Sequence, residues 1–149
     1  MKFEDLFKND SDKKKPTEKQ VIGRIGEDCV CKYLKKIGYR VIDRNYLKKW
    51  GEIDIVAIKD KKIHFIEVKS ASRQITLGQN KINLGRKDNY RPEDNMHQWK
   101  LERLGRVIQS YLLDKEIDDR VEWQFDVATV FVDVKRRISR VNLMEDVVL

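Results

Sequence analysis

The sequence predicts an α/β domain, a mixed sheet flanked by helices, with elements in the order α-β-β-β-α-β-β. Two stretches carry apolar residues at helical spacing, and five shorter runs have the length and apolar content of strands. The length of 149 residues suits one compact domain. Elements in this order favour a mixed sheet with helices packed against it.

The first helix is expected to begin at Thr17 and to end at Gly38. Thr17 and Gln20 have the spacing of a capping box, and glycine commonly ends a helix. The apolar residues between them recur at helical spacing: Val21, Ile22, Ile25, Cys29, Tyr33 and Ile37. Residues 1–16 are highly charged, so we expect a disordered leader there and one folded domain over residues 17–149.

The other elements follow from short apolar runs and one further periodic stretch. A long irregular segment, polar and containing glycine and proline, is expected between the third strand and the second helix. The predicted ranges are Tyr39–Ile42, Ile53–Ile58 and Ile63–Val68 for strands, Ser70–Asn95 for the irregular segment, Trp99–Leu113 for the second helix, and about Glu122–Val132 and Arg137–Leu143 for two closing strands.

The second and third strands form a predicted hairpin whose register brings charged residues together. A loop of two or four residues at its centre pairs residues whose numbers sum to 121, so Asp54 faces Glu67, and Glu52 faces Lys69. Directly opposed residues have Cβ atoms about 4.5–5.5 Å apart and share a face of the sheet. Two carboxylates and an ammonium group should therefore lie in one small patch.

Opposed carboxylates at Asp54 and Glu67 destabilise a ladder unless a cation lies between them. Carboxylate oxygens are ligands that Mg²⁺ and Mn²⁺ prefer. In the alternative interpretation, both acids are exposed at strand ends and Lys69 only neutralises them. The metal site is favoured because the acids interrupt otherwise apolar strands, IDIVAI and IHFIEV.

Glu27 is a third candidate metal ligand. It lies at the edge of the apolar stripe of the first helix, from where its side chain can reach the sheet. Gly23 and Gly26 precede it, and each costs about 1 kcal/mol relative to alanine in a helix. We therefore expect a close backbone approach at these glycines.

The net charge of +7 and the isoelectric point near 9.4 favour a polyanionic partner. The basic residues after the third strand are the expected phosphate-facing surface. The candidates for nucleic-acid binding are Lys100, Arg103, Arg73, Arg86 and Lys87. Trp50 and Trp99 could stack on unpaired bases, but packing in the protein is the favoured interpretation for both.

The sequence lacks the features of membrane and secreted proteins. No run of about 18 apolar residues is present, and the N-terminus is charged where a signal peptide needs an apolar stretch. Cys29 and Cys31 are two residues apart in a predicted helix, where they can neither pair nor share a metal. We expect a soluble cytoplasmic protein with reduced thiols and no membrane association.

The ordered segments GRIGEDCVCKYLKKIGYRVIDRN, GEIDIVA, FIEVKS, KLERL, SYL and FDV resemble the YraN family. That family is a member group of the PD-(D/E)XK, or restriction-endonuclease-like, nuclease superfamily, and the resemblance runs from about Val21 to Val127. It implies that Asp54 is the motif aspartate, that Glu67 and Lys69 are the E-x-K pair, and that Glu27 is the helix glutamate. Lys100 corresponds to an auxiliary basic residue.

The sequence departs from the superfamily pattern in two places. Ile53 stands where the superfamily name has proline, and Ser70-Ala71 replaces an expected Thr-Arg after the E-x-K pair. The second departure affects expected substrate contacts. The same order of acids and lysine is also similar to the archaeal Holliday-junction resolvases, which makes branched DNA a second expected substrate.

These observations lead to the hypothesis of an endonuclease that cleaves DNA and depends on Mg²⁺ or Mn²⁺. Asp54, Glu67 and Glu27 would hold the metal, and Lys69 would position the attacking water. Two alternatives stay open: a nucleic-acid-binding module without turnover, and a structural partner in a larger repair or uptake assembly. A homodimer is a further open expectation.

Overall fold

The computed structural model describes residues 15–75 and 97–149, and it has the predicted α/β order of elements. All strands belong to one five-stranded sheet in the order β1-β2-β3-β4-β5. The pair β3–β4 is parallel and the other neighbours are antiparallel, so the sheet is mixed as expected. Most of the predicted leader, residues 1–16, lies outside the described residues.

Helix α1, Glu18–Lys36, begins with the predicted capping box. The backbone N–H of Gln20 donates to Thr17 Oγ1 at 3.2 Å, and the backbone N–H of Thr17 donates to Gln20 Oε1 at 2.9 Å. These bonds satisfy two donors that a helix start would otherwise leave unpaired. Gly38, with a φ of +96°, follows the helix and turns the chain into the sheet.

The strands are β1 Arg40–Lys48, β2 Gly51–Lys59, β3 Lys62–Ser72, β4 Trp123–Asp133 and β5 Ile138–Met144. The expected end of β1 at Ile42 was wrong, because this edge strand is only half-buried and its polar residues hide its continuation. The predicted irregular segment also begins too early, since residues 70–72 still pair with β4. Its part from 76 to 96 lies outside the described residues.

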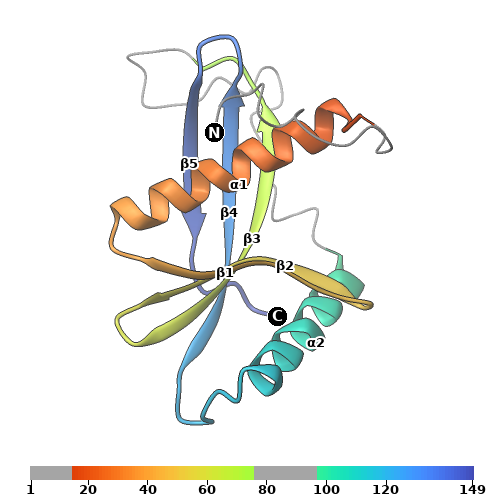
Figure 1. The fold of residues 1–149 in the computed structure, drawn as a ribbon, viewed down its shortest axis with the longest axis vertical. Coiled ribbons are helices and arrows are strands. Elements are labelled where there is room, and N and C mark those ends of the chain that lie inside the picture. Colours follow the sequence, from red (N-terminus) through yellow and green to blue (C-terminus); the bar gives the residue numbers. More distant parts are fainter. Residues whose placement is uncertain (1–14, 76–96) are drawn as a thin grey trace.

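Helix α2, Gln98–Asp114, connects the parallel pair β3 and β4, and two apolar clusters cover the two faces of the sheet. On one face α1 packs mainly on β3 and β4, and on the other α2 packs mainly on β2. Figure 1 shows α1 lying across β3, β4 and β5, with α2 at the far end of the molecule beside β2. Along β3, Ile66 belongs to the α1 cluster and Phe65 to the α2 cluster, so Glu67 points to the α2 face.

The β2–β3 hairpin has the predicted register over most of its length. Its pairs run from Lys59–Lys62 to Ile55–Ile66, and all of these residue numbers sum to 121. Asp60 and Lys61 both have positive φ, 51° and 64°, as in the tight turns that match strand twist.

The ladder ends at Ile55–Ile66, one pair short of Asp54 and Glu67. The predicted pairings of Asp54 with Glu67 and of Glu52 with Lys69 are therefore absent from the ladder, because β2 and β3 are no longer hydrogen-bonded beyond Ile55–Ile66. Asp54 and Glu67 lie just beyond the end of the ladder, and both line the same cleft.

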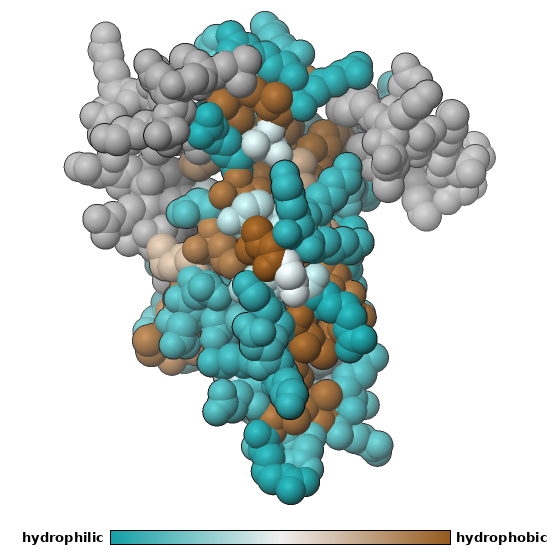
Figure 2. Space-filling view, turned by 90° about the vertical axis from the view of Figure 1, so that its left-hand side faces the viewer, coloured by the Kyte–Doolittle hydropathy of each residue, from teal (hydrophilic) through white to brown (hydrophobic). Residues whose placement is uncertain are grey.

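The exposed surface reflects the high content of charged residues. On the side of the molecule drawn in Figure 2, hydrophilic side chains cover most of the lower half, and apolar side chains are exposed between them. Apolar exposure of this extent is ordinary for a folded domain.

Candidate functional site

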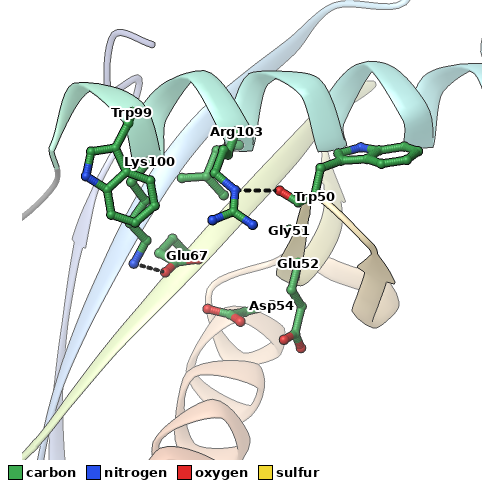
Figure 3. Close-up of a pocket in the computed structure, with 9 residues that line it drawn as sticks. Trp50, Gly51, Glu52, Asp54, Glu67, Trp99, Lys100 and Arg103 are labelled. Carbon is green, nitrogen blue, oxygen red and sulfur yellow. Dashed lines mark hydrogen bonds and ion pairs between the residues drawn. The ribbon is translucent and has the colours of Figure 1, made fainter.

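A cleft of about 330 Å³ lies between the first turns of α2, the start of β2 and the middle of β3. In Figure 3, Lys100 and Arg103 extend from α2 toward Glu67 and Asp54, while Glu52 lies beside Asp54. The residues lining the cleft are Trp50, Gly51, Glu52, Asp54, Glu67, Trp99, Lys100, Arg103 and Leu104.

Asp54 and Glu67 form the acidic centre of this cleft. The Glu67 side chain is buried, and Asp54 is half-buried, with the backbone N–H of Val68 donating to its Oδ2 at 2.8 Å. Burial, and next the charge of Glu67, raise the pKa of Asp54 from 3.8 to about 8. Without a cation, the two carboxylates therefore resist being ionised together.

Two lysines contact the same oxygen of Glu67. Lys69 Nζ lies 3.3 Å and Lys100 Nζ 3.2 Å from Glu67 Oε1. Burial, with a contribution from the neighbouring Lys100, lowers the pKa of Lys69. Burial also disfavours the charge of Lys100, but contact with Lys69 and Glu67 outweighs it and raises the pKa of Lys100. The two ammonium groups therefore differ, and Lys69 is the one that gives up its proton more easily.

Asn45 joins Glu27 to this centre. With its amide nitrogen turned toward the acids, it donates to Glu27 Oε1 and to Glu52 Oε1, each at 2.9 Å. Asn45 lies on β1 between residues whose partners flank Asp54, and its φ is +52°, a conformation that asparagine tolerates well. The predicted helix glutamate, Glu27, is thus not one of the residues that line the cleft, and Asn45 links it to Glu52, which does line it.

The pKa values of Glu27 and Glu52 are both raised, chiefly by burial. For Glu27, Arg44 opposes this shift, whereas the carboxylates of Glu52 and Glu67 add to it. For Glu52, the charge of Glu67 is the second cause. The charge of Glu67 thus contributes to the raised pKa values of Asp54, Glu52 and Glu27, which is the electrostatic setting in which a divalent cation is strongly attracted.

Glycines set the positions of the elements that carry these acids. A Cβ on Gly26 would collide with Ser70 Oγ and lie 2.8 Å from Val130 Cγ1, so α1 approaches β3 and β4 closely beside Glu27. Gly51 has a φ of +153°, and its Cβ would lie 2.8 Å from Val107 of α2. The expected close approach at Gly23 was wrong, because a Cβ added to Gly23 would have no neighbouring atom within 4 Å.

The predicted nucleic-acid residues fall into three groups. Lys100 and Arg103 line the cleft, and Arg103 Nε donates to the backbone oxygen of Trp50 at 3.0 Å. Arg73 instead lines a separate hollow of about 720 Å³ beside the β4–β5 turn. Arg86 and Lys87 lie outside the described residues.

The tryptophans divide between the two interpretations considered from the sequence. Trp50 is half-buried against the α2 cluster, and its Nε1–H donates to Ser110 Oγ at 3.1 Å, as packing requires. For Trp99 the expected packing was wrong, because 57% of its surface is exposed at the mouth of the cleft.

Sequence reasoning missed the participation of Asn45 and did not assign Glu52 a role. The position of Glu52 two residues before Asp54 on a strand would have placed both on one face. Asn45 carries no comparable signal, because its contact depends on a left-handed residue within β1.

A second polar cluster lies on the α1 face and ties the C-terminal segment to the sheet. His64 Nδ1 is 2.7 Å from Asp126 Oδ2, and the backbone N–H of Asp146 donates to Asp126 Oδ1 at 2.9 Å. The Tyr39 hydroxyl donates to Glu145 at 2.9 Å. One donor atom from each of His64, Asp126 and Glu145 lies within 4.8 Å of the others. Because each of these groups has a protein partner, the cluster has the character of a structural network.

The fold and the cleft define a class of protein: a mixed-sheet α/β domain with carboxylates and lysines gathered where two strands separate. The profile of the uncharacterised protein family UPF0102 matches residues 26–130, and the chain belongs to this family. This confirms the expected YraN family at the level of UPF0102. Membership of the nuclease superfamily stays a prediction.

Curated relatives cover most of the chain. A UPF0102 protein of Campylobacter jejuni subsp. doylei is 35% identical over 112 residues, or 75% of this chain and 85% of that protein. One from Alkaliphilus metalliredigens is 35% identical over 121 residues, covering 81% and 94%. One from Caldicellulosiruptor bescii is 29% identical over 125 residues, covering 84% and 94%.

Within the described residues, no helix is both long and apolar enough to span a membrane.

Proposed function

We propose that the protein is an endonuclease that hydrolyses DNA phosphodiester bonds with Mg²⁺ or Mn²⁺. The observation that carries this proposal is the pair Asp54 and Glu67, held together in the cleft with the Nζ of Lys69 3.3 Å from Glu67. A buried carboxylate pair is costly without a positive partner, and a lysine at its side adds a group able to act on a nucleophile.

The donor set fits a hard divalent cation. Asp54 and Glu67 supply carboxylate oxygens, and Glu27 and Glu52 are linked to the same opening through Asn45. Mg²⁺ is usually bound by one or two carboxylates and keeps several waters, so few protein ligands suffice. When bound, such a cation polarises a phosphate oxygen and lowers the pKa of a coordinated water.

The residues of the chain would then divide the work of hydrolysis. Lys69 would position the attacking water beside the two acids, and because its pKa is lowered, its ammonium group holds its own proton less tightly. As the new P–O bond forms, the bond to the leaving oxygen breaks. The attacking water gives its proton to solvent, and the leaving oxygen takes a proton from a solvent water. Lys100 and Arg103 line the cleft from α2, and their positive charges would attract and stabilise the negatively charged phosphate.

A DNA-binding module without turnover is the second candidate. The specific observation in its favour is that Lys69 and Lys100 already neutralise Glu67 within the protein. In that case the acids would orient the lysines for phosphate, and divalent cations would have no effect on the DNA.

The test is cleavage of linear, nicked, flapped and four-way DNA by the purified protein with Mg²⁺, with Mn²⁺ and with a chelator. We expect cleavage with metal only, and we expect Asp54→Asn to abolish it. The matched control is Asp60→Asn in the exposed turn of the same hairpin, which should cut like the wild type. Wild-type protein that cuts no DNA form with either metal would leave the binding module as the better account.

Lys69→Ala separates catalysis from binding. Because the proposed role of Lys69 is expressed in the transition state, this variant should bind DNA in chelator but cut about 10²–10⁴-fold more slowly. Glu67→Gln should also cut poorly, but through weaker metal binding, so raised Mn²⁺ should restore part of its activity. The same rise in Mn²⁺ should not restore Lys69→Ala, and cleavage at the wild-type rate by both variants would contradict the assigned roles.

A further inference from the structure

Trp99 is an exposed aromatic side chain placed at the edge of the candidate active site. It is the second residue of α2, 57% of its surface is exposed, and it lines the same cleft as Asp54 and Glu67. Leaving a large aromatic ring in water forgoes the stabilisation that burial would bring. An exposed ring beside a charged cleft therefore suggests a ligand that covers it.

Among the residues that the structure describes, Arg103 holds one face of the Trp99 ring in place. The guanidinium carbon of Arg103 lies over the Trp99 ring, 5.7 Å from its centroid, and Arg103 Nε is anchored to the backbone oxygen of Trp50. A cation over one face of an indole is attracted to it and fixes its orientation. With 57% of Trp99 exposed, no ring or cation of the described residues stacks on the opposite face, and an oriented ring lowers the entropy lost when a second ring stacks there.

The surroundings of the ring favour a polyanion over a protein partner or a second copy of the chain. Lys100 directly follows Trp99 and reaches Glu67, and Arg103 lies one helical turn further along the same side of α2. Cations interleaved with an exposed aromatic ring are the combination that binds single-stranded nucleic acid, where cations contact phosphates and bases stack on the ring.

In a continuous duplex, paired bases stack on one another and offer no free face to a ring on the protein surface. A base can cover Trp99 only if it is unpaired or is turned out of the helix. We propose that Trp99 stacks on an unpaired base next to the phosphate in the cleft, so that the substrates are DNA forms with unpaired nucleotides, such as flaps, gaps and single strands. This inference rests on the proposed function for the identity of the polymer.

The experiment measures DNA binding in chelator, where no turnover is needed. Dissociation constants are compared for a blunt duplex and for the same duplex with a single-stranded flap. Trp99→Ala should raise the dissociation constant for flapped DNA about 5- to 150-fold, which is the range expected for one stacked base. The ratio of the flap and duplex dissociation constants should approach one in this variant.

Two variants separate stacking from general damage to the surface. Trp99→Phe keeps an aromatic face and should retain most of the preference for flapped DNA. Leu113→Ala removes a 77% exposed apolar side chain from the other end of the same helix, and should leave the preference unchanged. Flapped DNA should also quench tryptophan emission in the wild type more than in Trp99→Phe, since the other two tryptophans, Trp50 and Trp123, are both packed against the α2 cluster.

The two proposals fail in different ways. If Trp99→Ala keeps the wild-type preference for flapped DNA while the wild type cuts DNA with metal, stacking is excluded and the nuclease stands. If flapped DNA binds through Trp99 and no DNA form is cut with either metal, stacking stands and the nuclease is excluded. A wild type that binds blunt and flapped duplex equally overturns the stacking proposal directly.

Discussion

At the scale of single residues, burial and the charged groups that line the cleft shift the pKa values of Asp54, Glu52 and Lys100. Glu67 accepts contacts from Lys69 and Lys100, and its negative charge also raises the pKa of Asp54. Asp54 is therefore less ready to ionise than an isolated aspartate, and the lowered pKa of Lys69 makes that residue less ready to stay charged. A bound divalent cation would lower the pKa values of the acids, because it stabilises their ionised forms.

The raised pKa of Asp54 predicts how stability depends on pH without metal. Asp54 in the folded protein keeps its proton up to about pH 8, whereas in the unfolded chain it loses it near 3.8. Its contribution to folding stability is thus fully present below the unfolded pKa and declines as pH rises to about 8. Asp54→Asn should remove this decline and raise the melting temperature most at pH 8, measured in chelator.

Metal should act in the opposite direction. Asp54 must lose its proton to bind Mg²⁺ or Mn²⁺, so the rise in melting temperature caused by metal should grow between pH 6 and pH 8.5. Asp60→Asn should behave like the wild type, and Asp54→Asn should show no gain at any pH. A metal-induced gain that is equal at both pH values, or that persists in Asp54→Asn, would place the cation elsewhere.

At the scale of the elements, the cleft exists because two helices approach the sheet closely on opposite faces. Gly26 lets α1 approach β3 and β4 beside Glu27, and Gly51 lets the start of β2 pass under Val107 of α2. The hairpin then opens where its ladder ends at Ile55–Ile66. The acids therefore come from three elements, α1, β2 and β3, and the packing of these elements positions them.

Two glycines in α1 provide a matched test of this packing. Gly26→Ala should lower the free energy of unfolding by about 1–3 kcal/mol, because the added methyl group overpacks the contact with Ser70 and Val130. Gly23→Ala has open space around it and should raise stability by about 0.5–1 kcal/mol through helix propensity. Urea unfolding of both variants checks this, and equal effects of the same sign would show that the close approach is not the reason for Gly26.

At the scale of the whole molecule, local patterns in the sequence predicted more than the contacts between distant segments. The capping box at Thr17 and the hairpin register needed only spacing and alternation, so both could be predicted. The continuation of β1 and the link through Asn45 depend on tertiary neighbours. The exposure of Trp99 also has no signal in the sequence, since an apolar residue on a helix is usually packed.

The charge of the whole molecule supports the last prediction, which concerns salt. A net charge of +7 and cations around the cleft should make DNA binding weaken with salt, with a log–log slope of roughly −0.9 per neutralised phosphate. Arg103 bonds a neutral carbonyl, so its charge is available to phosphate, and Arg103→Ala should make the slope shallower by about 1.

Arg120 is the matched control for this measurement, because its guanidinium group is already paired with both carboxylate oxygens of Asp118, at 3.0 and 2.9 Å. Arg120→Ala should therefore leave the slope as it is in the wild type. Titration of labelled flapped DNA in chelator over a range of KCl concentrations gives all three slopes. An affinity that does not change with salt, or an equal loss of slope in both variants, would show that the α2 side of the cleft is not where the phosphates lie.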